Sequence, residues 1–187
     1  MNTIPVLSAA TAAPEAKPVL EQVARSLGRI PNMYGVMAQS PAVLEAYVQF
    51  SNALRKGSIG NAMAERIALA AAEYNGCSYC LSAHSYLGAR TGLTAADIRD
   101  AREMKAGDEK TDAAMQFTRQ LLTTPQSLSE ANVSTLRAAG YTDGAILEII
   151  ANVVRNIFTN YLNVVAGTEV DWPEVVTPLK PAVHENE

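Results

Sequence analysis

The chain has 187 residues, of which 48% are hydrophobic and 18% charged, and its formal net charge is −4. This length allows one ordinary domain with a sizeable core, and the hydrophobic fraction excludes a disordered protein. The acidic balance argues against a nucleic-acid partner. The apolar runs are short and interrupted by charges, and residues 1–13 lack the features of a secretory signal. We therefore expect a cytoplasmic protein with no membrane partner.

Helical patterns dominate the sequence, because alanine is abundant and alternating β-branched runs are nearly absent. They predict an all-α fold with a single domain over residues 1–187. An extended arm over about 1–14 and a proline-containing tail over about 167–187 flank the helices. Capping patterns mark the helix ends, such as Ser40-Pro41 and the pair Thr94 and Asp97. The predicted helices span 15–27, 31–39, 41–54, 61–74, 77–91, 94–103, 108–122, 129–139 and 143–165.

Two consecutive predicted helices carry the pattern Glu65-x11-Cys77-x2-Cys80-x3-His84. The spacing puts Cys77, Cys80 and His84 on one helix face, where sulfurs one turn apart can form a disulfide. His84 lies one turn beyond Cys80, where it can exchange a proton with a thiol or a water. A tight reversal between the helices would bring Glu65 back over the cysteines. A lone C-x-x-C beside such groups predicts dithiol redox chemistry in a reducing compartment.

The same residues allow two other interpretations. The cysteines could be inert core residues, but their neighbourhood is polar. Cys77, Cys80 and His84 could bind zinc with Glu65 as a fourth ligand, but ligands on one continuous helix make tetrahedral coverage awkward. We therefore expect neither a metal nor a cofactor. A thioredoxin-type fold would need strands around the motif, and the sequence predicts none.

The predicted helix 143–165 is apolar around most of its circumference, which indicates burial by the fold or by a neighbouring subunit. One polar stripe remains, and its members lie within about 80° of one another at 100° per residue. A solvated edge or helix–helix hydrogen bonding is the favoured interpretation, and a polar wall facing the redox site or a subunit is the alternative. The stripe consists of Asn152, Asn156, Asn160 and Asn163.

The pattern from Glu65 to His84 resembles the active-site signature of alkylhydroperoxidase D (AhpD)-like proteins in the carboxymuconolactone decarboxylase superfamily. The run over residues 75–84 is similar to the peroxidase-related branch. This resemblance implies an all-α AhpD-like fold, a homo-oligomer (trimer or hexamer) and a dithiol peroxidase. Shorter similarities lie at Ile30-Pro31-Asn32, Ser40-Pro41, Asn160-Tyr161-Leu162-Asn163 and Asp171-Trp172-Pro173.

The resemblance also implies roles for the motif residues. Cys80 would attack a hydroperoxide, and Cys77 would close the disulfide, whereas the helix-end argument alone would make Cys77 the more acidic thiol. Glu65 and His84 would relay protons through water, and an external dithiol or thiol protein would re-reduce the pair. Tyr79 stands where the best-known members carry a second histidine, and helix geometry predicts that it packs away from the cysteine face.

Two further functions remain as alternatives. A carboxymuconolactone-decarboxylase-type lyase would need cationic groups for a carboxylated substrate, but Arg66 and Arg90 beside the motif form no obvious clamp. A non-peroxidatic disulfide exchanger or redox sensor would use the dithiol without peroxide turnover. Met33, Met37 and Tyr34 are expected in the core or in a pocket wall.

Overall fold

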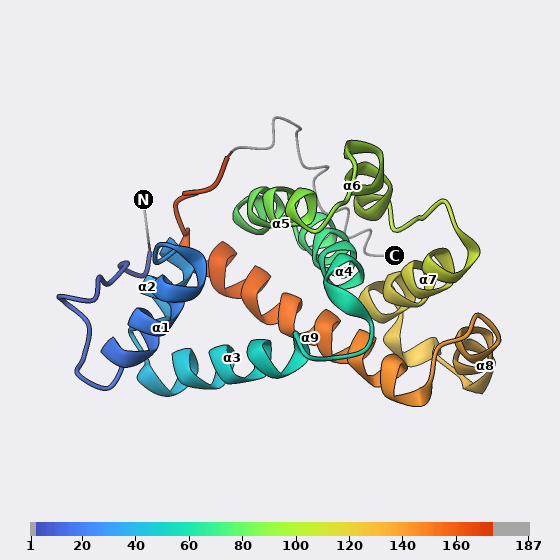
Figure 1. Ribbon diagram of the computed structural model, residues 1–187, viewed down its shortest axis with the longest axis horizontal. Helices are drawn as coiled ribbons and strands as arrows, with labels where there is room; N and C mark the ends of the chain where they lie inside the picture. The colour runs from blue at the N-terminus through green and yellow to red at the C-terminus, as the bar shows by residue number, and fades with distance from the viewer. Residues whose placement is uncertain (1–2, 174–187) are drawn as a thin grey trace.

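The computed structural model describes residues 3–173, which contain helices and no strand (Figure 1). The predicted all-α fold is confirmed, and each predicted helix end lies within two residues of the observed one. No helix in this part of the chain combines the length and apolarity needed to cross a membrane. The elements are α1 (Lys17–Leu27), α2 (Asn32–Met37), α3 (Pro41–Leu54), α4 (Gly60–Tyr74), α5 (Ser78–Arg90), α6 (Ala95–Arg102), α7 (Glu109–Thr123), the unpredicted 3-10 turn η1 (Pro125–Ser127), α8 (Glu130–Ala138) and α9 (Asp143–Ala166).

The helix boundaries follow the caps that the sequence carries. The Ser40 hydroxyl accepts from the Val43 amide at the start of α3, and Thr94 and Asp97 form a reciprocal capping box at α6. Gly167 adopts the left-handed conformation that ends α9. Local chemistry therefore determines where the helices stop, and packing determines how they are arranged.

Helix α4 lies at the centre of the larger core and contacts α5, α6, α7 and α9. Its alanines at 68 and 70–72 are fully buried, and such small side chains let neighbouring helices approach closely. Helix α9 crosses the middle of the molecule between α3 on one side and α4 and α5 on the other (Figure 1). A second, smaller core around Leu20 and Leu44 joins α1, α2 and α3.

The N-terminal arm has no helix over residues 3–14 and packs along α2. The Leu7 amide donates to the Gly35 carbonyl at 3.0 Å, and the Thr3 amide donates to the Ala166 carbonyl at 2.8 Å. A Cβ added at Gly35 would lie 2.5 Å from the Val6 side chain, so this contact needs glycine. Residues 1–2 of the predicted arm and 174–187 of the predicted tail lie outside the described residues.

A carboxylate from α9 holds the start of α4. Glu148 Oε2 accepts from the Ser58 amide at 2.7 Å and from the Ile59 amide at 3.0 Å. These amides belong to the unpaired groups that precede a helix, where a negative charge is favoured. A Cβ at Gly57 would lie 2.7 Å from the carboxylate, so glycine makes room for it. The contact fixes α9 against the helix that carries Glu65.

Candidate active site

The two cysteines form a disulfide at the reversal between α4 and α5. Gly76 has a φ of 66°, a conformation open to glycine, and it turns the chain into α5. Cys77 is the N-cap of α5 and not its first helical residue, and its Sγ accepts from the Cys80 amide at 3.2 Å. The predicted approach of the two sulfurs is thus present in the structure.

The two sulfurs differ in what they face. Cys77 is 1% exposed and Cys80 is 3% exposed, so neither lies on the open surface. Cys80 lines a pocket of about 100 Å³, and Cys77 is not among the residues that line it. This volume holds a few water molecules or the reactive end of a small organic substrate. Cys80 is therefore the sulfur that a molecule in the pocket would meet.

Glu65 and His84 lie together in the wall of the same pocket. His84 Nδ1 is 2.8 Å from Glu65 Oε2, and both side chains are largely buried. A carboxylate on one ring nitrogen orients the imidazole and leaves the other nitrogen for proton exchange. The structure thus brings three of the predicted site residues to one pocket, with Cys77 behind Cys80.

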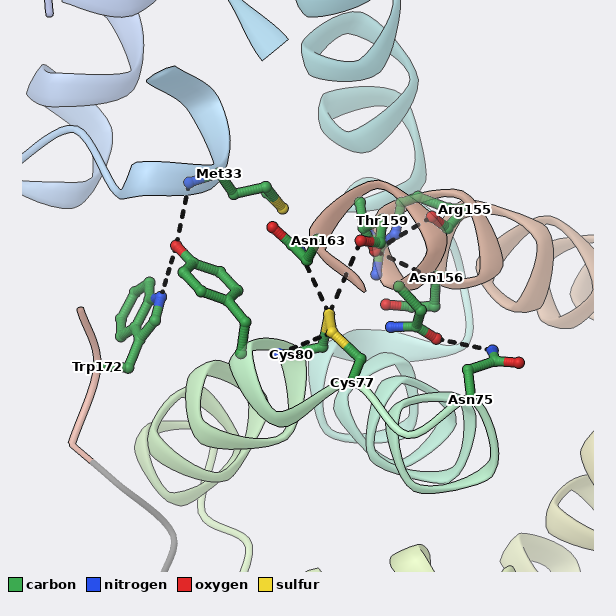
Figure 2. Close-up of a disulfide and its surroundings, with 11 residues drawn as sticks. Met33, Asn75, Cys77, Cys80, Arg155, Asn156, Thr159, Asn163 and Trp172 are labelled. Atoms are coloured by element: carbon green, nitrogen blue, oxygen red, sulfur yellow. Dashed lines mark hydrogen bonds between the residues drawn. A yellow bond between two sulfur atoms is a disulfide. The ribbon is translucent and has the colours of Figure 1, made fainter. Parts of the chain in front are cut away.

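The asparagine stripe of α9 is buried, so the expected solvated edge is wrong. Asn160 Oδ1 accepts from Asn75 Nδ2 at 2.9 Å, which is the expected helix–helix hydrogen bonding. Asn163 Nδ2 donates to Cys80 Sγ at 3.4 Å, as the alternative of a polar wall at the redox site predicts. Figure 2 shows the Cys80 sulfur facing Asn163 and the Thr159 carbonyl across the gap between α5 and α9. The stripe is buried because this face of α9 packs against α4 and α5.

Tyr79 lines the pocket together with Cys80 and His84, so the expectation that it packs away from them is wrong. Its hydroxyl accepts from the Met33 amide at 3.3 Å and from Trp172 Nε1 at 3.1 Å. Burial raises the pKa of Tyr79 well above its ordinary value, so the phenol stays neutral. The chain after α9 folds back and brings Trp172 to this wall, a long-range contact that helix geometry alone does not predict.

The other predicted candidates separate into pocket and structural residues. Met33 and Tyr34 line the pocket, whereas Met37 lies in the smaller core. Arg66 pairs with Asp97 at 2.6 Å between α4 and α6 and is not a pocket residue. Arg90 lies beside Tyr86, outside the pocket. Within residues 3–173, no group of three or more His, Cys, Asp or Glu side chains is arranged to hold a metal ion.

The sequence interpretation missed two arginines of the pocket. Arg55 follows α3 and Arg155 lies on α9, and both line the pocket that Cys80 lines. Arg155 carried a signal, since it is the one basic residue of a predominantly apolar helix. Nothing local distinguishes Arg55, because its position depends on the packing of α3 against α9.

The fold and the site define an all-α protein with a disulfide-forming cysteine pair at a small, partly polar pocket. Residues 41–123 match the carboxymuconolactone decarboxylase family. No curated protein matches the chain significantly. Several solved structures match the chain, and these matches show its fold.

An alkylhydroperoxidase AhpD core structure, an uncharacterized peroxidase-related protein from Ralstonia eutropha JMP134, has a TM-score of 0.83 at 21% identity over 91% of this chain and 92% of that one. A peroxidase-related protein from Silicibacter sp. TM1040 has a TM-score of 0.77 at 21% identity over 90% of this chain and 94% of that one. The debrominase Bmp8, as a variant in complex with 2,3,4-tribromopyrrole, has a TM-score of 0.76 at 23% identity over 91% of this chain and 92% of that one. The chain thus has the all-α fold of these AhpD-like structures, and its residues 41–123 are similar to the carboxymuconolactone decarboxylase family.

Proposed function

We propose that the protein is a dithiol-dependent peroxidase that reduces organic hydroperoxides to alcohols. The observation that carries this proposal is the shared pocket of Cys80, Glu65 and His84, from which Cys77 is excluded. A peroxidatic thiol needs access to its substrate and a neighbouring base, and a resolving thiol needs only access to the first sulfur. Cys80 meets the first requirement and Cys77 the second.

In the reduced protein, His84 takes the thiol proton of Cys80 through a water while Glu65 holds the imidazole in place. The Cys80 thiolate attacks the terminal oxygen of the hydroperoxide, and the oxygen–oxygen bond breaks. Cys80 becomes a sulfenic acid, and the departing alkoxide takes a proton from the relay and leaves as the alcohol.

The Cys77 thiol then attacks the Cys80 sulfur, which closes the disulfide and releases water. An external dithiol or thiol protein reduces this disulfide and is itself oxidised. Asn163 supports the attacking sulfur, because its Nδ2 faces Cys80 Sγ and a donated hydrogen bond favours the thiolate over the thiol.

We also propose that the protein acts as a homo-oligomer. Large apolar side chains of α3 and α9 are exposed on the single chain, and a contiguous patch of this kind is typical of an interface. Replacing Val154 and Phe158 by serine is expected to lower the mass measured by analytical ultracentrifugation to that of one chain. The apolar patch includes Val43, Phe50, Val154 and Phe158.

A second candidate function is reductive dehalogenation of a halogenated aromatic ring. Aromatic side chains of Tyr34, Tyr47, Tyr79 and Trp172 line the pocket, which suits a flat ring, and the similar structure of Bmp8 is that of a debrominase. The dithiol would supply two electrons and two protons, and the ring would exchange its halogen for hydrogen as halide leaves. Halide release at the expense of the dithiol would distinguish this function from peroxide reduction.

The decisive experiment follows hydroperoxide consumption by the reduced protein with a dithiol such as dihydrolipoamide. We expect steady turnover in the wild type, and loss of turnover in Cys80→Ser and in Cys77→Ser. Ser78→Ala is the matched control, because Ser78 is exposed between the two cysteines. Turnover that survives Cys80→Ser would refute the proposal. A disulfide that forms and is reduced without turnover would indicate an exchanger or sensor, and dithiol-independent turnover of a carboxylated lactone would indicate the lyase.

A further inference from the structure

The pocket has a second polar wall that peroxide chemistry does not use. Ser51 and Arg55 lie one turn apart on the same side of α3, and Asn152 and Arg155 do so on α9. Helices α3 and α9 contact each other, and all four residues line the pocket. Two facing helices thus present matched pairs, each with a small polar side chain and an arginine.

Two buried side-chain atoms of this wall lack hydrogen-bond partners. Ser51 Oγ and Asn152 Oδ1 are buried and make no hydrogen bond. Within residues 3–173, neither Arg55 nor Arg155 has a hydrogen bond or an ion pair for its guanidinium group. Buried polar atoms are ordinarily paired, so Ser51 Oγ and Asn152 Oδ1 are suited to a polar ligand, and the exposed Arg55 and the half-buried Arg155 beside them add positive charge.

The charges of the wall reach into the pocket. Burial raises the pKa of Tyr34 far above its ordinary value, and the nearby phenol of Tyr47 adds to this, while Arg55 and Arg155 act in the opposite direction. Glu65, the acidic side chain that lines the pocket, is already paired with His84. The α3–α9 wall therefore brings two positive charges to a pocket whose one lining carboxylate is already paired.

The wall and the cysteine lie at opposite ends of one helix face. Arg155, Thr159 and Asn163 follow one another along α9 at intervals of four residues, and Asn163 contacts Cys80. Eight residues of helix separate Arg155 from Asn163, a rise of about 12 Å, which the arginine side chain shortens. One small molecule could therefore present a reacting group to Cys80 and an anionic group to the arginines.

We propose that Arg55 and Arg155, with Ser51 and Asn152, form an anion-binding subsite that selects hydroperoxides carrying a carboxylate. The proposal rests on the proposed peroxidase function for the reacting end of the substrate. Two guanidinium groups bind a carboxylate through charge-assisted hydrogen bonds, and the hydroperoxide group then lies toward Cys80. Arg55 and Arg155 determine specificity and take no part in the transfer of electrons.

The kinetic test compares cumene hydroperoxide with its para-carboxylate derivative. We expect wild-type kcat/KM to favour the carboxylate by about tenfold or more, as hydrogen bonds to a charged group allow. Arg155→Gln and Arg55→Gln should each reduce this ratio, and the double variant should bring it to about one. Arg25→Gln, an exposed change on α1, should keep the wild-type ratio. A ratio near one in the wild type, or one that survives the double variant, would overturn the proposal.

A binding test separates this proposal from the peroxidase itself. In Cys77→Ser, Cys80 is the single thiol, and its alkylation by iodoacetamide can be followed by mass. We expect 4-isopropylbenzoate to slow the reaction and the neutral 4-isopropylbenzyl alcohol not to, with the difference lost in the double arginine variant. Carboxylate-selective protection in Cys77→Ser, together with a wild-type protein that turns over no hydroperoxide, would leave the anion subsite standing and refute the peroxidase. Equal protection by both compounds would refute the subsite, even if the protein turns over peroxide.

Discussion

The two faces of α9 depart from the usual pattern of a surface helix. The face toward α4 and α5 is buried and carries the four asparagines, and the opposite face is exposed and apolar. Val165 is 65% exposed, whereas Asn160 is fully buried. An amphipathic helix normally buries its apolar side. The buried face also contributes apolar residues such as Ile149 to the larger core, so the unusual features of α9 are its buried asparagines and its exposed apolar side chains.

The difference between the faces follows from what each one contacts. On the asparagine face, Asn163 donates to Cys80 Sγ and Asn160 accepts from Asn75, so these buried polar side chains have polar partners. The apolar face fits a second copy of the chain, as proposed above. One side of the helix would then contact the reactive cysteine, and the other side would form the interface between subunits.

The largest contrast in stability lies between Ile149 and Val165. Ile149 is completely buried in the larger core, so Ile149→Ala should reduce the free energy of unfolding by about 2–5 kcal/mol. Val165→Ala on the exposed face should change it by less than about 0.5 kcal/mol in the single chain. Urea unfolding at low protein concentration measures both. Equal losses would mean that the exposed face is part of the core.

The next contrast concerns reactivity. Asn163→Leu removes the donor that faces Cys80 Sγ, so the pH midpoint for alkylation of Cys80 should move upward and peroxide consumption at neutral pH should fall about tenfold or more. Val164→Ala, on the exposed side of the same helix, should change neither. An unaltered midpoint in Asn163→Leu would show that the contact serves only packing.

A smaller effect, on the free energy of unfolding, is expected at the contact between Asn75 and Asn160. Asn160→Leu removes the acceptor at 2.9 Å, which should cost about 1 kcal/mol of unfolding free energy. A double-mutant cycle with Asn75→Ala isolates the pairwise contribution. A coupling energy near zero would contradict the view that the asparagine face ties α9 to the reversal before α5.

The smallest effect is expected at the first turn of α9. Hydrogen bonding from Arg137 lowers the pKa of Asp143, so this carboxylate stabilises the fold above its unfolded pKa and loses that contribution as pH falls through the native value. Both groups are exposed, so the effect is small and screened by salt. In Asp143→Asn, the free energy of unfolding should fall slightly less steeply as the pH is lowered into the acid range. Urea unfolding at a series of pH values measures this. A large loss at neutral pH would contradict this.

The sequence predicted the helices well because their ends depend on local chemistry. The cap at Ser40 and the box at Thr94 and Asp97 act within one turn, and the structure shows them as expected. The grouping of Glu65 with Cys80 and His84 was also predictable, because it depends on one tight reversal between adjacent helices.

The remaining features of the site depend on contacts between distant parts of the chain. A stripe of asparagines has the same period whether it faces water or a buried pocket, so periodicity could not place Asn163 beside Cys80. Arg55 reaches the pocket through the packing of α3 on α9, and Tyr79 meets Trp172 from beyond α9. Such long-range contacts leave no mark in the local pattern.

In the proposed mechanism, Cys80 reacts with the hydroperoxide, and Cys77 then resolves the sulfenic acid that forms on Cys80. The most direct measurement treats Cys77→Ser and Cys80→Ser with one equivalent of hydroperoxide and traps sulfenic acid with dimedone for mass spectrometry. We expect rapid labelling of Cys80 in Cys77→Ser, and little labelling of Cys77 in Cys80→Ser. Rapid sulfenic acid formation at Cys77 with none at Cys80 would contradict it and reverse the roles of the two sulfurs.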